Sequence, residues 1–553
     1  MAVGLLGTAA SGLLAFQRAI SVTGNNISNA NNESYSRQRI EFGTREASFN
    51  GSGYVGNGVK IESIERMFDQ FTVDRLRETG STASQYETLF RFSERVTNLL
   101  GDTEAGLGGG LERFFDAVQT VADDPASIPA RQLLLSESGS LVARIQSLDG
   151  QLDAMSREIN GNLDTIVTEI NGLSAGIADV NRSIVDASSQ ASSAVPNDLL
   201  DKRDAMINRL SELISVRTVE QDDGAVNVFV GSGQALVTRF LDSPLQVQRN
   251  DFDASRAEIA IVSGGVSAVI TNNLTGGQLG AVLDFRDQVL DPARNSLGRI
   301  AISLATAFNL QSTAGMDLDG AAGTDYFSVT TPVAVASLNN TGTATVTASF
   351  DTANISSLTT EDYTLTFDGA AWQLSRVSDG QAVTMTGTGT AVDPFLFDGL
   401  SVEVTAGAVA GDRFQIRPTR SGAAGMGLLI SNPREIAAAA PAAGPAPGDN
   451  SNALLLAGLQ TSLTMENGST SFQGAYSQLI GQLGTQTRSA EITARAQSAL
   501  HEQAQESRDA LSGVNLDEEA ADLIRFQQAY QAIAQVISVA DTTFQTLLSA
   551  VGR

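Results

Sequence analysis

Few residues in this chain have side chains that can do acid–base, nucleophilic or metal chemistry. Cysteine is absent from the 553 residues, and the single histidine is His501. The lack of thiols excludes disulfides, thiolate metal ligands and cysteine nucleophiles, and a single histidine makes most acid–base and metal sites difficult to build. His501 lies among Glu502, Gln503 and Arg508 in a helical pattern, so we interpret it as a surface histidine.

Three short motifs resemble catalytic or ligand-binding signatures, but each lacks part of the pattern. Residues 172–176, GLSAG, match the nucleophile elbow of serine hydrolases, yet they lie inside a long helical repeat. Residues 317–325, DLDGAAGTD, lack the full ligand set and the closing glutamate of a calcium loop, which leaves an ordinary turn. Residues 51–59, GSGYVGNGV, lack the lysine of a phosphate-binding loop and predict a turn or hairpin. We therefore expect a protein that is not an enzyme, with no cofactor and no metal.

Composition narrows the class further. The chain carries 62 acidic and 35 basic residues, a formal net charge of −27, which disfavours binding to nucleic acid. Its length predicts three or four structural units. Apolar runs are only a few residues long, so we expect no membrane insertion. The apolar N-terminus lacks the basic start, unbroken apolar stretch and cleavage site of a secretory signal, so we expect it to be retained.

A heptad pattern opens the chain and predicts an amphipathic helix that needs a helical partner. The bulky residues of its apolar face are Leu6, Leu13, Phe16, Ile20 and Ile27. Asparagines then crowd the sequence at Asn25, Asn26 and Asn29, and asparagine favours turns over helix interiors. The helix is therefore expected to end near residue 30.

A second heptad pattern closes the chain and supplies a possible partner. Its apolar positions are Leu523, Phe526, Tyr530, Ile533, Ile537, Phe544 and Leu547. Asn515 can cap this helix, with Glu518 three residues later as in a capping box. The two terminal helices can pair with each other or with copies of themselves, so these apolar positions are the candidate assembly interface.

The interior of the chain alternates between helical and strand patterns. Residues 66–122 predict helices broken by the glycines at 106–110, and residues 141–184 predict one helix of about six heptads. Helix is expected again at 277–312, with a kink or break at Pro292. These segments together predict a helical bundle.

Strand patterns predict two β-regions. Residues 216–270 contain short apolar runs between Gly, Asp and Asn turns, and residues 325–420 contain Asp-Gly hairpins. The Ala-Pro stretch 435–450 is expected to be a linker or loop before a helix at 452–511.

This order predicts a mainly α, multidomain chain with an inserted β-domain. Its topology is nested, because each inner unit combines a segment from the N-terminal part of the chain with one from the C-terminal part. The ends meet at one pole, and the outer β-rich domain is expected at the other. The expected units are a terminal coiled-coil domain of residues 1–30 with 515–553, a turn and linker of 31–65, a helical domain of 66–315 with 452–514 that includes the β-rich segment 216–270, an inserted β-domain of 325–420, and a linker or loop of 421–451.

Both ends of the chain carry a resemblance to a known family. Residues 11–38, SGLLAFQRAISVTGNNISNANNESYSRQ, resemble the N-terminal signature of bacterial flagellar axial proteins. The ending Tyr-Ser-Arg-Gln and residues 512–548, SGVNLDEEAADLIRFQQAYQAIAQVISVADTTFQTLL, are similar to the hook-associated proteins of the first hook–filament junction. Further similar stretches lie at 196–213, 283–309 and 315–327, so the resemblance covers most of the chain.

The resemblance implies a structural role in the bacterial flagellum. It implies export of an unfolded chain by the flagellar type III apparatus without a cleaved signal peptide, and self-assembly into a ring on the hook tip. The implied partners are the hook protein on the proximal side, a second junction protein on the distal side, and a cytoplasmic export chaperone on the C-terminal helix. The terminal helices would form the inner layer, with the β-domain facing outward.

The resemblance also marks a turn between the layers. Its residues are Asn25, Asn26, Asn29, Ser34, Tyr35 and Arg37. Related sequences usually carry glycine before the tyrosine. If the backbone there needs a positive φ, Ser34 would be strained.

Two alternatives remain open at this point. One is another flagellar axial protein of the hook, rod or filament type. The other is a secreted adhesin-like protein that binds through its β-domain, with Trp372 as the first candidate contact. A place for Trp372 in the core of that domain is the simpler interpretation.

Overall fold

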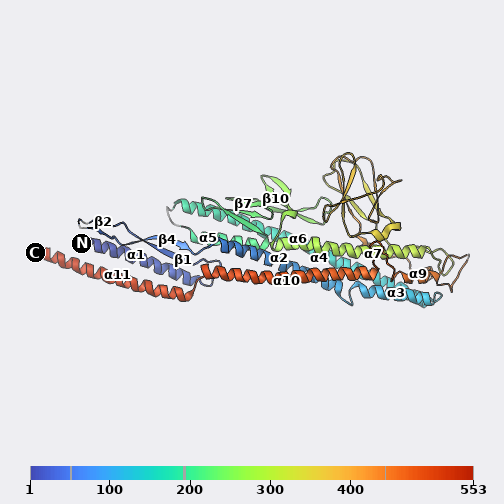
Figure 1. Ribbon diagram of the computed structural model, residues 1–553, viewed down its shortest axis with the longest axis horizontal. Helices are drawn as coiled ribbons and strands as arrows, with labels where there is room; N and C mark the ends of the chain where they lie inside the picture. Colours follow the sequence, from blue (N-terminus) through green and yellow to red (C-terminus); the bar gives the residue numbers. More distant parts are fainter. Residues whose placement is uncertain (1, 50, 52, 191–194, 443, 552–553) are drawn as a thin grey trace.

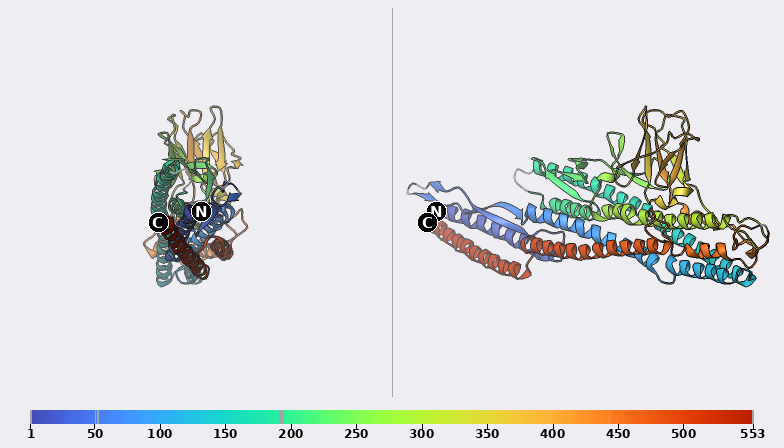
Figure 2. Two further views of the ribbon diagram at one scale, coloured as in Figure 1. Left: turned by 90° about the vertical axis from the view of Figure 1, so that its left-hand side faces the viewer. Right: turned by 45° about the vertical axis from the view of Figure 1, so that its right-hand side comes forward.

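The computed structural model describes residues 2–49, 51, 53–190, 195–442 and 444–551. The molecule is long and narrow, with both chain termini at one end (Figure 1). The β-domain rises from the flank of the opposite half (Figures 1 and 2). The expectation that it forms the pole opposite the termini is wrong, because loops beside α7 and α9 form that tip.

The terminal unit consists of two paired helices, α1 (Ala2–Ser28) and α11 (Leu516–Val551), which lie side by side (Figure 1). Residues 31–65 were expected to be a turn and linker. Residues 31–37 form a turn, and the chain from Gln38 to Arg66 forms a β-hairpin that we call the arm. Its strands β1 (Gln38–Thr44) and β4 (Val59–Arg66) pair antiparallel and contact α1. At its tip lie β2 (Ser48–Phe49) and β3 (Tyr54–Val55), which also pair antiparallel.

The helical body is built on long helices that run along the molecular axis. They are α2 (Gln70–Gly101), α3 (Leu107–Asp123), α4 (Ile128–Gln190), α5 (Asn197–Leu213) and α10 (Phe472–Ser512). α2 and α10 lie side by side over much of their length (Figure 1). The break expected at glycines 106–110 lies slightly earlier, because α3 already begins at Leu107. Asp102 turns the chain there by accepting hydrogen bonds from the backbone N–H groups of Glu104 and Ala105.

The long helix expected at 141–184 is confirmed and extended by α4, which has 63 residues. Its apolar positions are buried in the main core, including Leu152, Ile159, Leu163 and Ile170, each 0% exposed. Leu163 fills the place where Asn162 interrupts the repeat. The seam of α4 therefore packs within the chain, since α3, α5 and α7 all contact it.

The helix expected at 277–312 is continuous, but it changes its winding. α6 (Gly277–Phe285) passes through a π-helical turn, η2 (Arg286–Leu290), into α7 (Asp291–Thr313). Pro292 sits in the first turn of α7, so the irregularity precedes the proline instead of breaking the helix at it. A π-turn widens the helix, which accommodates a residue that cannot donate a backbone hydrogen bond.

Two small sheets cover part of this body, as expected for residues 216–270. The first has the order β5-β6-β7-β8, and the second has the order β11-β10-β9. Their strands are β5 (Val216–Glu220), β6 (Val226–Val230), β7 (Gln234–Thr238), β8 (Leu241–Asp242), β9 (Leu245–Arg249), β10 (Ala257–Ser263) and β11 (Val266–Val269), followed by η1 (Thr271–Asn273).

The inserted β-domain contains a five-stranded and a three-stranded sheet over a core of its own. The larger sheet has the order β13 (Val333–Ala336), β20 (Arg413–Arg417), β15 (Tyr363–Phe367), β16 (Trp372–Arg376), β17 (Ala382–Val383). The smaller has the order β14 (Val346–Phe350), β19 (Leu400–Val404), β18 (Phe395–Phe397), with η3 (Thr352–Ser357) after β14. Both Asp-Gly hairpins form. Asp398 and Gly399 have φ of 43° and 75°, as a tight two-residue turn requires.

The segment that returns to the body is more structured than expected. It contains α8 (Gly422–Gly425), η4 (Pro433–Glu435), α9 (Ser451–Gly458) and β21 (Gly427–Leu428), which pairs with β12 (Phe327–Ser328). Most of the segment expected to be a linker or loop, 421–451, is irregular, but residues 436–439 are buried, so it packs into the body. The helix expected at 452–511 is two helices, α9 and α10. A turn with positive φ at Glu466, Asn467 and Gly468 lies between them.

Candidate assembly interface at the terminal helices

The two terminal helices approach closely because α1 presents small residues to α11. The buried positions of α1 are Ala9, Gly12, Ala15, Ala19, Thr23 and Asn26. A Cβ atom added at Gly12 would lie 2.8 Å from Cδ1 of Ile533 on α11. Small side chains at such a crossing allow backbones to approach, so larger residues there would push the helices apart.

The bulky residues expected to be the buried seam of α1 occupy its flanks instead. Leu6, Leu13, Phe16, Ile20 and Ile27 are only half-buried. Phe16 illustrates their position. Its ring lies 5.6 Å from that of Phe42 on the arm and 6.1 Å from that of Phe526 on α11, and the last two are 6.3 Å apart. The three rings therefore join α1, α11 and the arm.

Most of the expected positions on α11 face α1 but keep part of their surface in solvent. The half-buried residues are Leu523, Phe526, Tyr530, Ile533 and Ile537. Ala540 is buried, whereas Phe544 is 37% exposed. The side chain of Leu547 lies outside those that the structure describes. The pairing of α1 with α11 thus forms within one chain and leaves apolar surface beside it.

Asn26 ties the end of α1 to the arm and to α11. Its Nδ2 donates to the backbone oxygen of Gln38 at 2.9 Å and to Oε2 of Glu519 at 3.0 Å. Its Oδ1 accepts from the hydroxyl of Tyr35 at 2.7 Å and from the N–H of Gln38 at 3.0 Å. Asn26 is 1% exposed, so these four bonds satisfy a buried amide. Burial raises the pKa of Tyr35 to about 12, and the negative charge of Asp201 is the next largest cause of this rise.

Arg37 makes a second link between the same elements. Its Nε donates to Oε1 of Glu519 and its Nη1 donates to Oε2 of Glu518, each at 2.7 Å. Its backbone N–H donates to the carbonyl of Ser512 at 2.8 Å. Asn515 caps α11 as expected, since its Oδ1 accepts from the N–H of Asp517 at 3.0 Å. The carboxylates of Glu518 and Glu519 bind Arg37.

The remaining residues of the turn have local roles. Asn25 donates to the hydroxyl of Tyr35 at 3.3 Å, and Asn29 donates to the carbonyl of Asn25 at 3.0 Å. Ser34 donates its N–H to Oδ1 of Asn32 at 3.2 Å. Among the described residues other than glycine, positive φ occurs at Arg239, Asp398, Glu466 and Asn467. The strain considered for Ser34 is therefore absent from this turn.

A buried network connects the turn to the helical body, and sequence reasoning missed it. Asp201 on α5 accepts from the N–H of Ser36 at 3.2 Å and from Arg66 at 3.1 Å. Arg66 also binds Asp204 at 2.6 Å, and Asp204 binds Arg77 of α2 at 3.0 Å. Burial raises the pKa of Asp201 against the opposing effect of its hydrogen bonds. No local pattern marks these residues, because their partners are distant in sequence.

Apolar residues remain exposed on the paired helices. They are Leu5 and Leu14 on α1, and Leu516, Ile524, Val536, Val539, Phe544 and Leu548 on α11. Residues 4–28 of α1 are also long and apolar enough to cross a membrane by length and composition, so the expectation that no segment reaches this threshold is wrong. Here α1 pairs with α11 instead.

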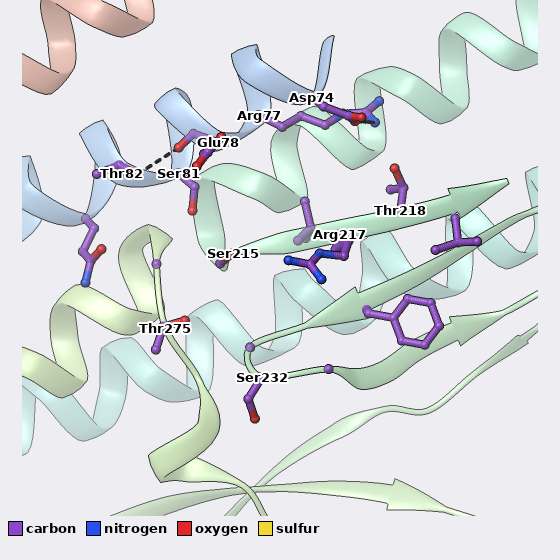
Figure 3. A pocket seen from close by; sticks show the side chains of 17 residues that line it. Asp74, Arg77, Glu78, Ser81, Thr82, Ser215, Arg217, Thr218, Ser232 and Thr275 are labelled. Carbon is purple, nitrogen blue, oxygen red and sulfur yellow. Dashed lines mark hydrogen bonds and ion pairs between the residues drawn. The ribbon is translucent and has the colours of Figure 1, made fainter. Parts of the chain in front are cut away.

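A separate cavity of about 830 Å³ lies between α2 and β5 (Figure 3). Arg77 lines it but is held by Asp204 and by Oδ1 of Asn208 at 2.8 Å. The remaining walls combine short polar side chains such as Ser81 and Thr218 with the charged Asp74, Glu78 and Arg217. In the part of the chain that the structure describes, no three Asp, Glu or His side chains are placed to hold a metal ion.

The motifs weighed in the sequence have structural roles. Residues 172–176 lie within α4, and residues 53–59 lie at the tip and on one strand of the arm. Asp317 closes a turn by accepting from the N–H groups of Asp319 and Ala321. His501 differs from expectation, because it is half-buried against Gly80 of α2. Trp372 is half-buried against Phe367 and the β-domain core.

Comparison with known proteins identifies the family. The model described as the flagellar hook-associated protein FlgK helical domain matches residues 93–327, and the hook-associated protein 1 D2-like domain matches 335–418. The C-terminal model of the basal body rod FlgEFG proteins matches 508–550, and the basal body rod protein model matches 6–35. Flagellar hook-associated protein 1 of Salmonella typhimurium is 33% identical over 555 residues, with 99% of each chain covered.

The chain belongs to the flagellar hook-associated protein 1 family. Its relative in Escherichia coli K12 is 32% identical over 99% of each chain. The solved structure of the flagellar hook junction protein FlgK from Burkholderia pseudomallei matches with a TM-score of 0.73 at 26% identity, covering 79% of this chain and all of that one. The mainly helical fold with an inserted β-rich region is thereby confirmed, as is the resemblance seen at both ends of the sequence. The chain is a structural component of the flagellum.

Proposed function

We propose that this chain forms the hook–filament junction by polymerising through its terminal helix pair into a ring on the hook tip. The observation that carries the proposal is the apolar surface left on α1 and α11 after they pair within one chain. Large exposed apolar patches mark interaction sites. Residues such as Val539, 64% exposed, and Ile524, 55% exposed, gain stability when a neighbour covers them. Each large side chain contributes roughly 1.5–3 kcal/mol on full burial.

The half-buried residues of the expected interface fit the same proposal. Leu13, Ile20 and Ile537 are each half-buried, so part of each side chain stays in contact with solvent. A neighbouring subunit that packs on these flanks completes their burial. We therefore assign the contacts between subunits to the flanking positions of α1 and α11. The small residues of α1 make the contacts between the two helices within one chain.

Partners and export follow from the family and are part of the proposal. The hook protein adjoins the ring on its proximal side, and a second junction protein adjoins it on the distal side. The chain leaves the cell unfolded through the flagellar type III apparatus and keeps its N-terminus. Before export, a cytoplasmic chaperone binds α11 in a helix-in-groove mode, for which the apolar series Val536, Val539, Phe544 and Leu548 is suited.

The test is an assembly assay in cells that lack the native gene product. Deletion is expected to give hooks without filaments, with flagellin shed into the medium, as seen by electron microscopy and blotting. An Ile524→Asp variant, on α11 but outside the series assigned to the chaperone, is expected to be exported and folded but to give the same bare hooks, because the charge opposes burial between subunits. Gln535→Asp, at an exposed polar position of the same helix, adds the same charge outside the apolar series.

Two readouts separate assembly from export. Variant protein in the medium shows that export proceeds, and protein retained in cells shows that the chaperone or export step is impaired. Normal filaments on cells carrying Ile524→Asp would contradict the proposed interface. Normal filaments after deletion of the whole chain would contradict the junction role.

A further inference from the structure

The β-domain is joined to the helical body by a largely charged interface. In the described residues, Ile302 on α7, 1% exposed, is the side chain of the body that enters the β-domain core cluster. Asn295 of the same helix donates to the carbonyl of Thr360 at 2.9 Å. Interfaces between domains of one chain are typically polar, and relative motion is expected unless the interface is large and hydrophobic.

Asp291, at the start of α7, is the centre of the charged part. Its Oδ1 accepts from Arg420, which follows the last strand of the β-domain, and its Oδ2 accepts from Arg256 of the body. Arg256 also binds Oδ1 of Asp287 at 2.5 Å. Asp291 and Arg420 are 15% and 17% exposed, so the link between the two parts is mostly shielded from solvent.

The loop between β9 and β10 contacts the β-domain at a second place. Asp253 binds Arg417 on β20, and both are at most 14% exposed. The carbonyl of Asp251 accepts from the N–H of Leu338 at 3.2 Å, and its Oδ2 accepts from Asn339 at 2.9 Å. Body and β-domain are thus connected by several charged pairs that act together.

The interface is incompletely satisfied. A pocket of about 270 Å³ that opens to solvent is lined by residues of both parts. Around it, buried polar atoms without a hydrogen-bond partner include Oδ1 of Asp149, Nε of Arg294, Nε of Arg417 and Oγ of Ser421. Buried ion pairs often only balance the cost of their desolvation, and unsatisfied atoms add to that cost. Separation of the two parts, which hydrates these groups, is therefore weakly opposed.

We propose that this charged cluster is a reversible latch, which holds the β-domain against the helical body and opens in response to ionic strength and pH. Salt screens the pairs once the interface begins to open, so high ionic strength favours the open form. The pH response comes from Asp362, which immediately precedes β15 and has a buried Oδ1 without a partner.

The direction of the pH response follows from the surroundings of Asp362. Burial raises the pKa of Asp362 to about 6, and the charge of Asp291 acts in the same direction. The charges of Arg420, Arg417 and Arg256 act in the opposite direction. In the open form the group is hydrated and has its ordinary pKa, so the closed form binds the proton more tightly. Protonation of Asp362 therefore stabilises the closed form. This stabilisation is complete at pH values below the ordinary pKa of aspartate, and it is lost as pH rises through 6. The closed-to-open ratio is expected to fall by up to roughly 100-fold over this range.

The absence of cysteine allows a direct test by distance measurement. Val392 on the β-domain is 96% exposed and Ile492 on α10 is 54% exposed, so Val392→Cys with Ile492→Cys places two spin labels on the full chain. The distance distribution between labels is expected to be narrow at pH 5 and low salt, and to gain a second population at pH 8 or at 1 M salt. A single narrow distribution under all these conditions would overturn the proposal.

Three variants of the labelled chain assign the effect. Asp291→Asn is expected to populate the open form at every pH, and Asp362→Asn is expected to remove the pH dependence and keep the salt dependence. Asp319→Asn is the matched control, because it removes an exposed ion pair with Arg434 away from the interface. Unchanged pH dependence in Asp362→Asn would contradict the assignment to that group. Should Asp291→Asn fail to fold, the salt and pH series on the unsubstituted labelled chain still decides the proposal.

Discussion

Asn26→Asp is the sharpest single perturbation of the junction between the terminal helices and the arm. The change is nearly isosteric, but it replaces a donor with a carboxylate oxygen at 3.0 Å from Oε2 of Glu519. It removes the two bonds that Nδ2 donates and places two negative charges together in a site that is 1% exposed. At an effective dielectric constant of about 20, the repulsion between them is about 5–6 kcal/mol.

A shared proton limits this cost. An aspartate with an ordinary pKa of about 3.9 takes up a proton at pH 7 for about 4 kcal/mol, and at pH 5 for about 1.5 kcal/mol. The pair then has a raised pKa, and the shared proton restores one hydrogen bond between the carboxyl groups. The variant is therefore expected to lose about 4 kcal/mol of local stability at pH 7 and to recover most of it at pH 5.

Hydrogen exchange of the amides of α1 and α11 measures this difference. After correction for the intrinsic rate at each pH, exchange is expected to be about 1000-fold faster than in the unsubstituted chain at pH 7, and about tenfold faster at pH 5. Asn32→Asp is the matched control, because its Oδ1 only accepts a bond and its side chain is exposed. Equal protection of Asn26→Asp at pH 7, or an equal loss at both pH values, would refute the reasoning.

Three further changes test the packing described above. Gly12→Val is expected to lower the stability of the helix pair by about 1–3 kcal/mol, because the new side chain forces Ile533 away, and hydrogen exchange in α11 measures this loss. Gly24→Val is the control, because the space around Gly24 is open and the change alters only the helix propensity. Leu152→Ala, at a fully buried position of α4, is expected to lower the free energy of unfolding of the helical body by about 2–5 kcal/mol in chemical denaturation. Tyr35→Phe removes two hydrogen bonds at the turn, the one that the hydroxyl donates to Asn26 and the one that it accepts from Asn25, and is expected to cost about 1–3 kcal/mol in chemical denaturation; a neutral effect would contradict a stabilising role for these bonds.

The strength of each sequence signal explains which features were predictable. The helix that contains Leu152 and the terminal helices have repeats sustained over many turns, and such repeats identify helices well. The face that is buried most deeply was not predictable in α1. Gly12 and Ala15 have small side chains that contribute little to a hydrophobic heptad pattern. Their small size nevertheless permits the close approach of α1 and α11. Asp201 and Glu519 stand in ordinary helical sequence, and only the folded chain brings them to the turn.

The arm shows a different limit. Its strands are short and mix charged with apolar residues, as in Arg39, Ile40 and Glu41, so the sequence is typical of a surface connection. Its register depends on contacts with α1 that no neighbouring residue specifies. The position of the β-domain on the flank was equally inaccessible, because the charged pairs that connect it to the body join residues far apart in the chain, such as Asp253 and Arg417.

The union of the first and last helices has a consequence for the order in which the molecule can be completed. Asn26 and Glu519 are 493 residues apart along the chain, yet they share a buried hydrogen bond. A chain that emerges from its N-terminus therefore finishes the body while α1 still lacks its partner, and the terminal unit closes only when the final segment arrives. A prematurely ended chain has no α11 and cannot build this unit. Joining the two ends thus makes completeness of the polypeptide a condition for building the unit through which we propose that the chain assembles.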